Sequence, residues 1–181
     1  HQFLEWAQGT GKFDLEFAHG ALRKGDPANV TLAALARGKF HPSILTGLYE
    51  GRPAHRVGGY FPNVESLRYL SNRGLWKKFL QQFDRHLVIS GYAFDAAPLA
   101  ENNVPYLLWA ATDIDSEREL TIRSASPLRR FLNSIQMPEI RRRESLALKK
   151  ADWVFATTEW MRQRLIARGA SAQRSSVLPI P

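Results

Sequence analysis

The stretch that decides the fold is residues 139–181, which read EIRRRESLALKKADWVFATTEWMRQRLIARGASAQRSSVLPIP. Glu139–Lys150 is rich in good helix formers, and Trp153–Thr157 is a short apolar run of strand length. Met161–Arg168 is typical of a second helix and is followed by a glycine, the residue that most often ends helices. Val177–Ile180 is apolar again. Strands that alternate with helices in this way predict a parallel sheet with covering helices.

The composition bounds the possible classes of protein. The 181 residues are 44% hydrophobic, which is enough for one well-buried domain. The absence of cysteine excludes disulfides and thiolate metal sites and fits a cytoplasmic location. No apolar run reaches the roughly 18–20 residues that a membrane-spanning helix needs. The formal net charge of +8 serves solubility, or it favours an anionic membrane surface, a phosphorylated ligand or nucleic acid.

The N-terminal part of the chain predicts a first strand–helix–strand unit. Phe3–Ala7 is a candidate strand, and a helix begins near Phe13, with apolar residues at spacing four. Val30–Ala36 is a continuous apolar run, which is typical of a strand buried on both faces. Residues 37–62 are interrupted by glycine and proline, and within them Ala54–Val57 is a candidate short strand.

The middle of the chain continues the alternation. It predicts helices over Val64–Phe83 and Asp95–Asn102, strands over His86–Ser90 and Tyr106–Ala111, and a loop over Ser124–Pro138. Together with the other elements this makes five or six strands separated by helices. The sequence therefore predicts an α/β fold with a doubly wound, mostly parallel sheet of Rossmann type.

A glycine-containing turn, Gly9-Thr10-Gly11, follows the first candidate strand. Glycine lets the backbone approach a ligand closely, and a helix N-terminus behind such a loop favours phosphate oxygens. The turn lacks the third glycine of the dinucleotide fingerprint and the Gly-Lys-Ser/Thr of a P-loop. A tight turn without a ligand explains it equally well.

Carboxylates gather after the candidate strand Tyr106–Ala111, where the sequence runs TDIDSERE from Thr112. Ligands of open parallel sheets bind at the carboxyl ends of the strands, so Asp113 is the strongest candidate for an acid–base or hydroxyl-binding group. The alternative is that Asp113 caps a helix whose acidic first turn favours the helix dipole. The cluster has neither a calcium-loop pattern nor a histidine partner for zinc, so no metal is expected.

Five arginines follow within fifteen residues: Arg129, Arg130, Arg141, Arg142 and Arg143. With the apolar residues Leu128, Phe131 and Leu132 beside the first two, this predicts a cationic patch for an anionic surface, one that contacts lipid headgroups or phosphates. A solvated helix face is the alternative interpretation.

The segment from Glu144 onward resembles the end of the N-terminal domain of glycosyltransferase family 4. The residues that carry the resemblance are the helix with Glu144, the Ala151-Asp152 step into a strand, Thr158 after that strand, and the final run Ser176–Pro181. The resemblance implies one half of a GT-B architecture. Residues 1–176 would form the Rossmann-like N-terminal domain, and 177–181 the last strand and the start of the interdomain linker. The C-terminal donor-binding domain would lie outside the chain.

The resemblance also implies an activity and roles for residues. Such enzymes move a sugar, with retention, from a nucleotide-sugar donor to a glycan or lipid-linked acceptor, without a metal or other cofactor. Gly9-Thr10-Gly11 would lie near the donor diphosphate, and Asp113 or Gly91 stands where many members place a histidine. The further candidates on the acceptor side are Tyr92, Asp115, Glu117 and Arg118. Because the donor half is missing, we expect the isolated domain to be inactive.

Two departures from the family pattern bear on these roles, since the family's usual glycine pair is Gly-Thr-Gly here and the histidine is missing. The leading hypothesis is the acceptor domain of a cytoplasmic transferase, with peripheral contact to the inner face of an anionic membrane left open. The alternative is an NAD(P)-dependent Rossmann oxidoreductase, in which Arg37 after Val30–Ala36 would suit NADP. A non-catalytic nucleic-acid or partner-binding module is a third reading, although no known nucleic-acid motif supports it and no nucleic acid is expected as a partner.

Overall fold

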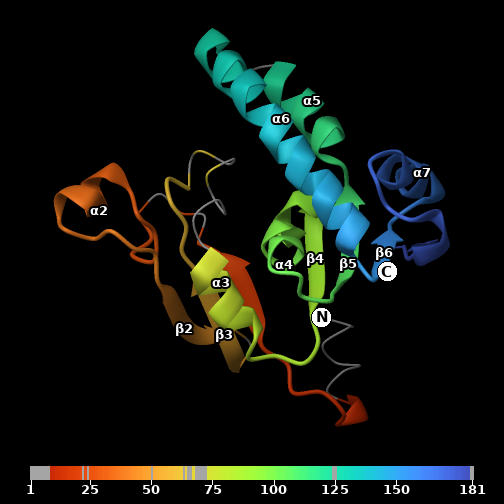
Figure 1. The fold of residues 1–181 in the computed structure, drawn as a ribbon, viewed down its shortest axis with the longest axis horizontal. Coiled ribbons are helices and arrows are strands. Elements are labelled where there is room, and N and C mark those ends of the chain that lie inside the picture. The colour runs from red at the N-terminus through yellow and green to blue at the C-terminus, as the bar shows by residue number, and fades with distance from the viewer. Residues whose placement is uncertain are drawn as a thin grey trace. The chain divides into compact units, whose positions relative to one another are not determined.

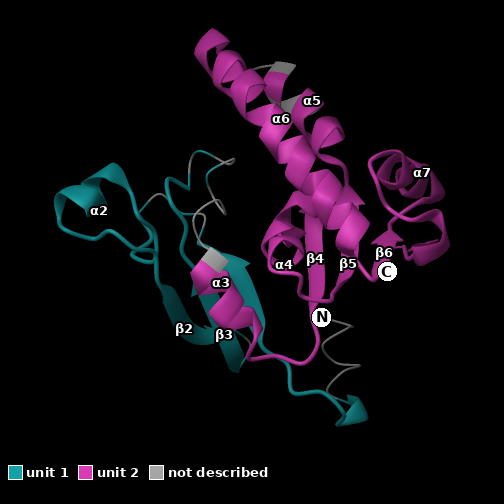
Figure 2. Cartoon of the chain, in the orientation of Figure 1, with its two compact units in different colours: residues 1–71 teal, residues 72–181 magenta. Residues whose placement is uncertain are grey.

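The computed structural model describes residues 9–21, 23, 25–49, 51–62, 64, 67, 73–123 and 126–179. The chain divides into two compact units, His1–Ser71 and Asn72–Pro181 (Figure 2). Each unit has its own sheet, so the chain has the α/β class that the sequence predicts, but its described strands form two sheets.

The second unit contains a four-stranded, all-parallel sheet in the order β4-β5-β6-β7 (Figure 1). Its strands are β4 (Leu87–Tyr92), β5 (Leu107–Thr112), β6 (Trp153–Ala156) and β7 (Ser175–Val177). The register places Leu87 beside Leu107, and Leu107 beside Trp153. Every connection moves one strand further in the same direction, so right-handed crossovers place the connecting helices on one face of the sheet.

Helical segments connect the strands. A 3₁₀ segment, η2 (Ala93–Ala96), and α4 (Ala97–Glu101) connect β4 to β5, while α5 (Ile114–Arg123) and α6 (Pro127–Lys150) connect β5 to β6. α7 (Glu159–Ala167) and the short η3 (Ala172–Arg174) lead to β7. The unit begins with α3 (Arg73–Leu80). The core between sheet and helices is fully buried and includes Phe94, Leu108, Ile140, Leu148 and Val154.

The first unit holds a mixed three-stranded sheet in the order β1-β3-β2. β1 (Phe17–Gly20) runs parallel to β3 (Arg52–Val57), and β2 (Ile44–Tyr49) is antiparallel to β3. The short helix α2 (Leu32–Ala36) lies between β1 and β2 in the chain. Val30 pairs with Tyr60 in an isolated parallel bridge.

Two predictions for the N-terminal region are wrong. The expected helix from Phe13 is replaced by an extended segment and β1, because Phe17–Gly20 pairs with Ala54–Val57 along β3. The expected strand over Val30–Ala36 is mostly the helix α2, which begins where the Thr31 side chain accepts a hydrogen bond from the Ala34 N–H at 3.2 Å. Leucine and alanine favour a helix once that cap is in place.

The predicted loop over Ser124–Pro138 is also wrong, since from residue 127 it forms the first half of α6. Ser126 caps this helix by accepting from the Arg129 N–H, and Pro127 occupies the first turn, where no N–H is needed. Pro138 lies inside the helix. Proline at the first position of a helix is a favoured start rather than an interruption.

The remaining predictions agree with the structure where it describes them. The predicted strands beginning at His86, Tyr106 and Trp153 are confirmed to within two residues, as is the short strand within β3. Thr158 caps α7 by accepting from the Met161 N–H at 3.1 Å, and Gly169 ends it with a φ of 126°. The last strand is displaced to Ser175–Val177. The predicted strand Phe3–Ala7 and part of the predicted helix Val64–Phe83 lie outside the described residues, and within that helix α3 covers Arg73–Leu80.

Candidate functional site

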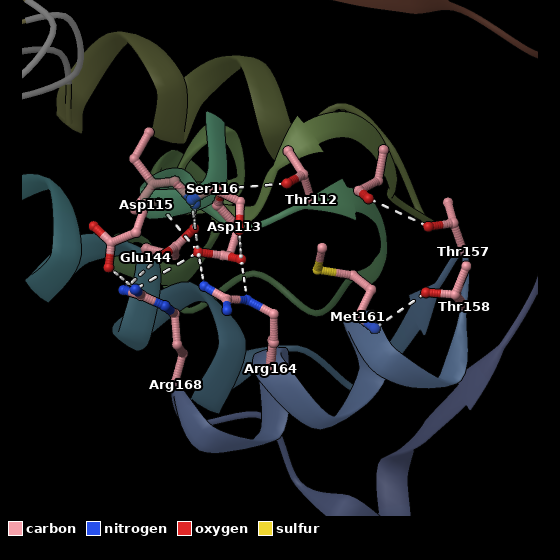
Figure 3. Close-up of polar contacts among 12 residues, drawn as sticks. Thr112, Asp113, Asp115, Ser116, Glu144, Thr157, Thr158, Met161, Arg164 and Arg168 are labelled. Atoms are coloured by element: carbon pink, nitrogen blue, oxygen red, sulfur yellow. Dashed lines mark hydrogen bonds and ion pairs between the residues drawn. The ribbon is translucent and has the colours of Figure 1, made fainter. Parts of the chain in front are cut away.

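Polar side chains gather at the carboxyl end of β5 and form a network of hydrogen bonds and ion pairs (Figure 3). Asp113, the residue after the strand, is fully buried and stands at the N-terminus of α5. Its Oδ1 accepts from the N–H groups of Asp115 and Ser116 at 3.1 and 3.2 Å. Its Oδ2 accepts from the Ser116 hydroxyl at 2.7 Å. Asp113 therefore caps the helix.

Two arginines of α7 reach the same carboxylate. Arg164 donates from Nε to Oδ2 at 2.6 Å and from Nη2 to Oδ1 at 3.2 Å, and Arg168 Nη2 lies 3.6 Å from Oδ1. Burial by itself would raise the pKa of Asp113, but hydrogen bonds from Arg164 and Ser116 outweigh burial and hold the pKa at about 2. A carboxylate that is ionised at every physiological pH and accepts bonds on both oxygens is a poor general base.

A second buried carboxylate, Glu144 of α6, lies beside Asp113. Its Oε1 accepts from the Ile114 N–H at 3.0 Å, and its Oε2 from Arg168 Nη1 at 3.4 Å. Burial raises the pKa of Glu144 to about 7, and the negative charge of Asp113 adds to the rise, while the bond from Ile114 opposes it. Glu144 thus holds the first residue of α5, and its own pKa lies near neutral pH.

Asp115 completes the cluster. It pairs with Arg141 of α6, at 2.9 Å between Oδ1 and Nη2, and its other oxygen contacts Arg168. Arg168 therefore bridges Asp113, Asp115 and Glu144. The cluster joins the start of α5, the second half of α6 and the C-terminal end of α7 to the end of β5, and this geometry favours the helix-cap interpretation of Asp113.

A solvent-open pocket of about 480 Å³ adjoins this cluster. Its lining comes from α5 and α6 and includes three guanidinium groups and two carboxylates: Asp115, Arg118, Glu119, Ile122, Arg130, Asn133, Met137 and Arg141. A second pocket of about 490 Å³ is lined by Arg141, Ser145, Arg164, Ala167 and Arg168. The structure thus brings the acceptor-side candidates Asp115 and Arg118 together with Arg130 and Arg141 of the predicted patch. Guanidinium groups at this density suit an anionic ligand.

The predicted cationic patch, which would contact an anionic surface, needs one correction. Arg143 is only 1% exposed and is enclosed by Glu101 and Glu139, at 3.0 and 2.9 Å. It is a buried ion pair and cannot contact a surface. Arg142 is exposed but pairs with Glu139 through two bonds of 2.8 Å, whereas Arg129 and Arg130 are exposed in the first turn of α6.

The other predicted residues of the second unit lie at the end of β4 and on α5. Gly91 and Tyr92 end β4, and the Tyr92 ring stacks on Phe94 with centroids 6.3 Å apart. Glu117 is exposed on α5.

The predicted phosphate loop belongs to the first unit. Gly9 and Thr10 are helical, and Gly11 has a φ of 60°. They precede an extended segment, so the strand–loop–helix geometry that motivated this site is not formed after Gly11.

The sequence interpretation missed the two arginines that organise the cluster. Arg164 and Arg168 are four residues apart, which places them on one face of α7. That spacing was the available signal, but nothing in the sequence pairs it with Asp113, 51 residues earlier.

A hydroxyl–imidazole–carboxylate chain occurs in the first unit. His55 Nε2 lies 2.6 Å from Glu16 Oε2, and its Nδ1 lies 3.1 Å from Thr46 Oγ1. Thr46 and His55 are cross-strand partners in β2 and β3. These three side chains together tie the segment before β1 to the β2–β3 pair and thereby stabilise the small sheet.

The described residues contain no group of three or more His, Cys, Asp or Glu side chains placed to hold a metal ion. No helix in the described part of the chain has the length and apolarity to cross a membrane.

Comparison of the chain with known protein families, with curated proteins and with solved structures gave no match. Its function is therefore inferred from residues and geometry.

Proposed function

We propose that this chain is the N-terminal, acceptor-binding domain of a retaining glycosyltransferase with GT-B architecture. The observation that supports this best is the placement of the residues that carry the family resemblance. Glu144 holds the start of α5 at the carboxyl end of β5, and Thr158 caps α7 beyond β6. Both residues lie near the carboxyl ends of the parallel strands, which is where ligands bind in such folds.

The chemistry assigned to this edge is binding and orientation. Transfer of a sugar needs the acceptor hydroxyl, the anomeric carbon and the leaving diphosphate in line, and a domain that fixes the acceptor contributes through proximity. Tyr92 and Thr112 are register partners at the ends of β4 and β5, so their side chains are close enough to contact one acceptor. In this proposal Asp113 positions α5 below them.

The cationic pocket between α5 and α6 supports an acceptor that carries phosphate. Arg118, Arg130 and Arg141 line it, and phosphate oxygens accept hydrogen bonds from guanidinium groups. A lipid-linked saccharide bears such a phosphate. The nucleotide-sugar would be bound mainly by the second half of the architecture.

The two alternative functions have less support. A dinucleotide-binding domain needs a strand, a glycine turn and a helix in that order, whereas Gly11 is followed by an extended segment and β1. A nucleic-acid module has no specific observation in its favour among the described elements.

Binding of the chain to an array of glycans and lipid-phosphate-linked saccharides tests the proposal. We expect saturable binding to one acceptor class, a clear loss in Thr112→Val, and no loss in the matched control Ser171→Ala. Incubation with nucleotide-sugars should give no turnover. Saturable binding of NADPH, or a salt-dependent shift of DNA, without any glycan binding would refute the proposal.

A further inference from the structure

The first half of α6 has a second apolar face that the fold does not bury. Leu128, Phe131, Leu132 and Ile135 follow the spacing of one helical face and are 68, 62, 48 and 61% exposed. The buried side of the same helix is formed further along, by residues such as Met137 and Ile140. Ile135 and Met137 are separated by about 200° of helical rotation, so the exposed face points away from the buried one.

This face lies at the free end of a helical hairpin. Figure 1 shows the start of α6 and the end of α5 extending together beyond the sheet of their unit. α6 packs against η2, α4 and α5, and its buried residues all lie at or beyond Met137. The exposed face, which we call the apolar stripe (Leu128, Phe131, Leu132 and Ile135), therefore sits where folding of this unit does not require it.

Positive charge is concentrated around the apolar stripe. Residues 118–135 contain four arginines and one glutamate, which gives a net charge of +3 from 4 − 1. Burial, and after it the neighbouring charge of Arg129, lowers the pKa of the Arg118 guanidinium. Arg118 and Arg130 line the pocket between α5 and α6, on the side of α6 away from the stripe, and Arg129 lies between that side and the stripe. Like charges gathered at one end of a hairpin repel one another, and an anionic surface relieves that repulsion.

We propose that the apolar stripe and the arginines beside it dock this chain on an anionic phospholipid surface. Leucine, phenylalanine and isoleucine enter the boundary between headgroups and acyl chains, and the arginines bind the lipid phosphates. The charge argues for this occupant, because the chain carries +8 overall and the tip shares that sign. The inference does not rest on glycosyl transfer. If the chain binds glycans but not vesicles, the docking proposal fails alone; if it binds vesicles but not glycans, the proposed function fails alone.

Vesicle cosedimentation tests the docking with a closely matched pair of variants. Phe131 and Phe40 are 62 and 61% exposed, in different units. On vesicles of phosphatidylcholine with phosphatidylglycerol, Phe131→Ser should lower the partition coefficient about tenfold, and Phe40→Ser should leave it unchanged. Arg129→Gln should lower it roughly fivefold, whereas Arg37→Gln, an exposed arginine elsewhere, should have little effect. Pure phosphatidylcholine vesicles and high salt should both weaken binding.

A second measurement needs no destabilising change. The chain has no cysteine, so Ile135→Cys creates a single site for an environment-sensitive dye. Its emission should shift to the blue on anionic vesicles, and a dye on Phe40→Cys should not shift. Equal binding to neutral and anionic vesicles, or an unshifted dye at position 135, would overturn the docking. A dimer in solution that Phe131→Ser converts to monomers would also overturn it, since a second copy would then cover the stripe.

Discussion

Arg164 of α7 donates from Nε to the Oδ2 of Asp113, at the end of β5, across 2.6 Å. The carboxylate is fully buried, and the arginine side chain is 38% exposed. This pair joins two elements 51 residues apart and decides the ionisation of Asp113. It holds the Asp113 carboxylate ionised at neutral pH, which suits a helix cap better than an acid–base group.

Replacing Arg164 by Gln should destabilise the second unit. Asp113 keeps its bonds from Ser116 and the contact with Arg168, and Arg164 is partly solvated. The free energy of unfolding should therefore fall by about 1–3 kcal/mol, which is less than the full value for a buried pair. Urea unfolding monitored by tryptophan fluorescence measures it. The control Arg142→Gln breaks an exposed pair and should cost less than about 1 kcal/mol. Equal losses in both variants would contradict the assigned role.

Glu144 should make stability depend on pH. Its pKa in the folded state is about 7, against an ordinary value of 4.5. The folded state therefore binds the proton more tightly, so this contribution is complete below about pH 4.5 and is lost as the pH rises to 7, by up to about 3 kcal/mol. In Glu144→Gln the free energy of unfolding should fall less as the pH rises, because the amide does not ionise and its oxygen still accepts from the Ile114 N–H. Unfolding at pH 5 and 7.5 tests this, with the exposed Glu159→Gln keeping the wild-type slope.

The buried hydroxyl of Tyr106 should contribute to the joint between β5 and α6. It donates to the Ala147 carbonyl at 2.5 Å, and burial, followed by the charge of Asp152, raises the pKa of this phenol. Tyr106→Phe leaves that buried carbonyl without this donor and should cost about 1–2 kcal/mol in thermal or urea unfolding. The exposed hydroxyl of Tyr60, which donates to Phe40 at 3.1 Å, provides the control. Tyr60→Phe should be within about 0.5 kcal/mol of the wild type.

Gly58 should be essential for the first unit. A Cβ at this position would lie 2.0 Å from the Ala28 carbonyl oxygen, a backbone atom that cannot move without distorting the bond between Ser43 N and the same oxygen. Gly58→Ala should cost more than about 3 kcal/mol or prevent folding of residues 1–71. Limited proteolysis of this unit gives the readout. Gly47→Ala, in β2, meets no atom within 4 Å and should resist cleavage like the wild type.

The sequence by itself was informative where local signals agree with the packing. In the final segment, the apolar run that begins at Trp153 and the stop at Gly169 predict a strand start and a helix end that the structure has. Each of these signals acts within one turn or one strand, so it can be recognised without knowing what packs against it.

The N-terminal unit shows where such signals fail. Phe13 and Phe17 are spaced as on a helix, but Phe13 is 48% exposed and Phe17 begins a strand. The pairing of β1 with β3, more than thirty residues away, overrides the local preference. The local sequence of a segment does not show which distant strand will pair with it.

The sequence determined that this is an α/β chain, with strands at β4 to β6, an acidic helix start after β5 and an excess of arginine. Only the tertiary structure decided what those groups do. It buried Arg143, placed Arg164 and Arg168 on Asp113, and left the apolar stripe of α6 uncovered. The physical reason is that burial and charge pairing depend on elements brought together from distant parts of the chain, and these decide whether a charged group is structural or free to bind a ligand.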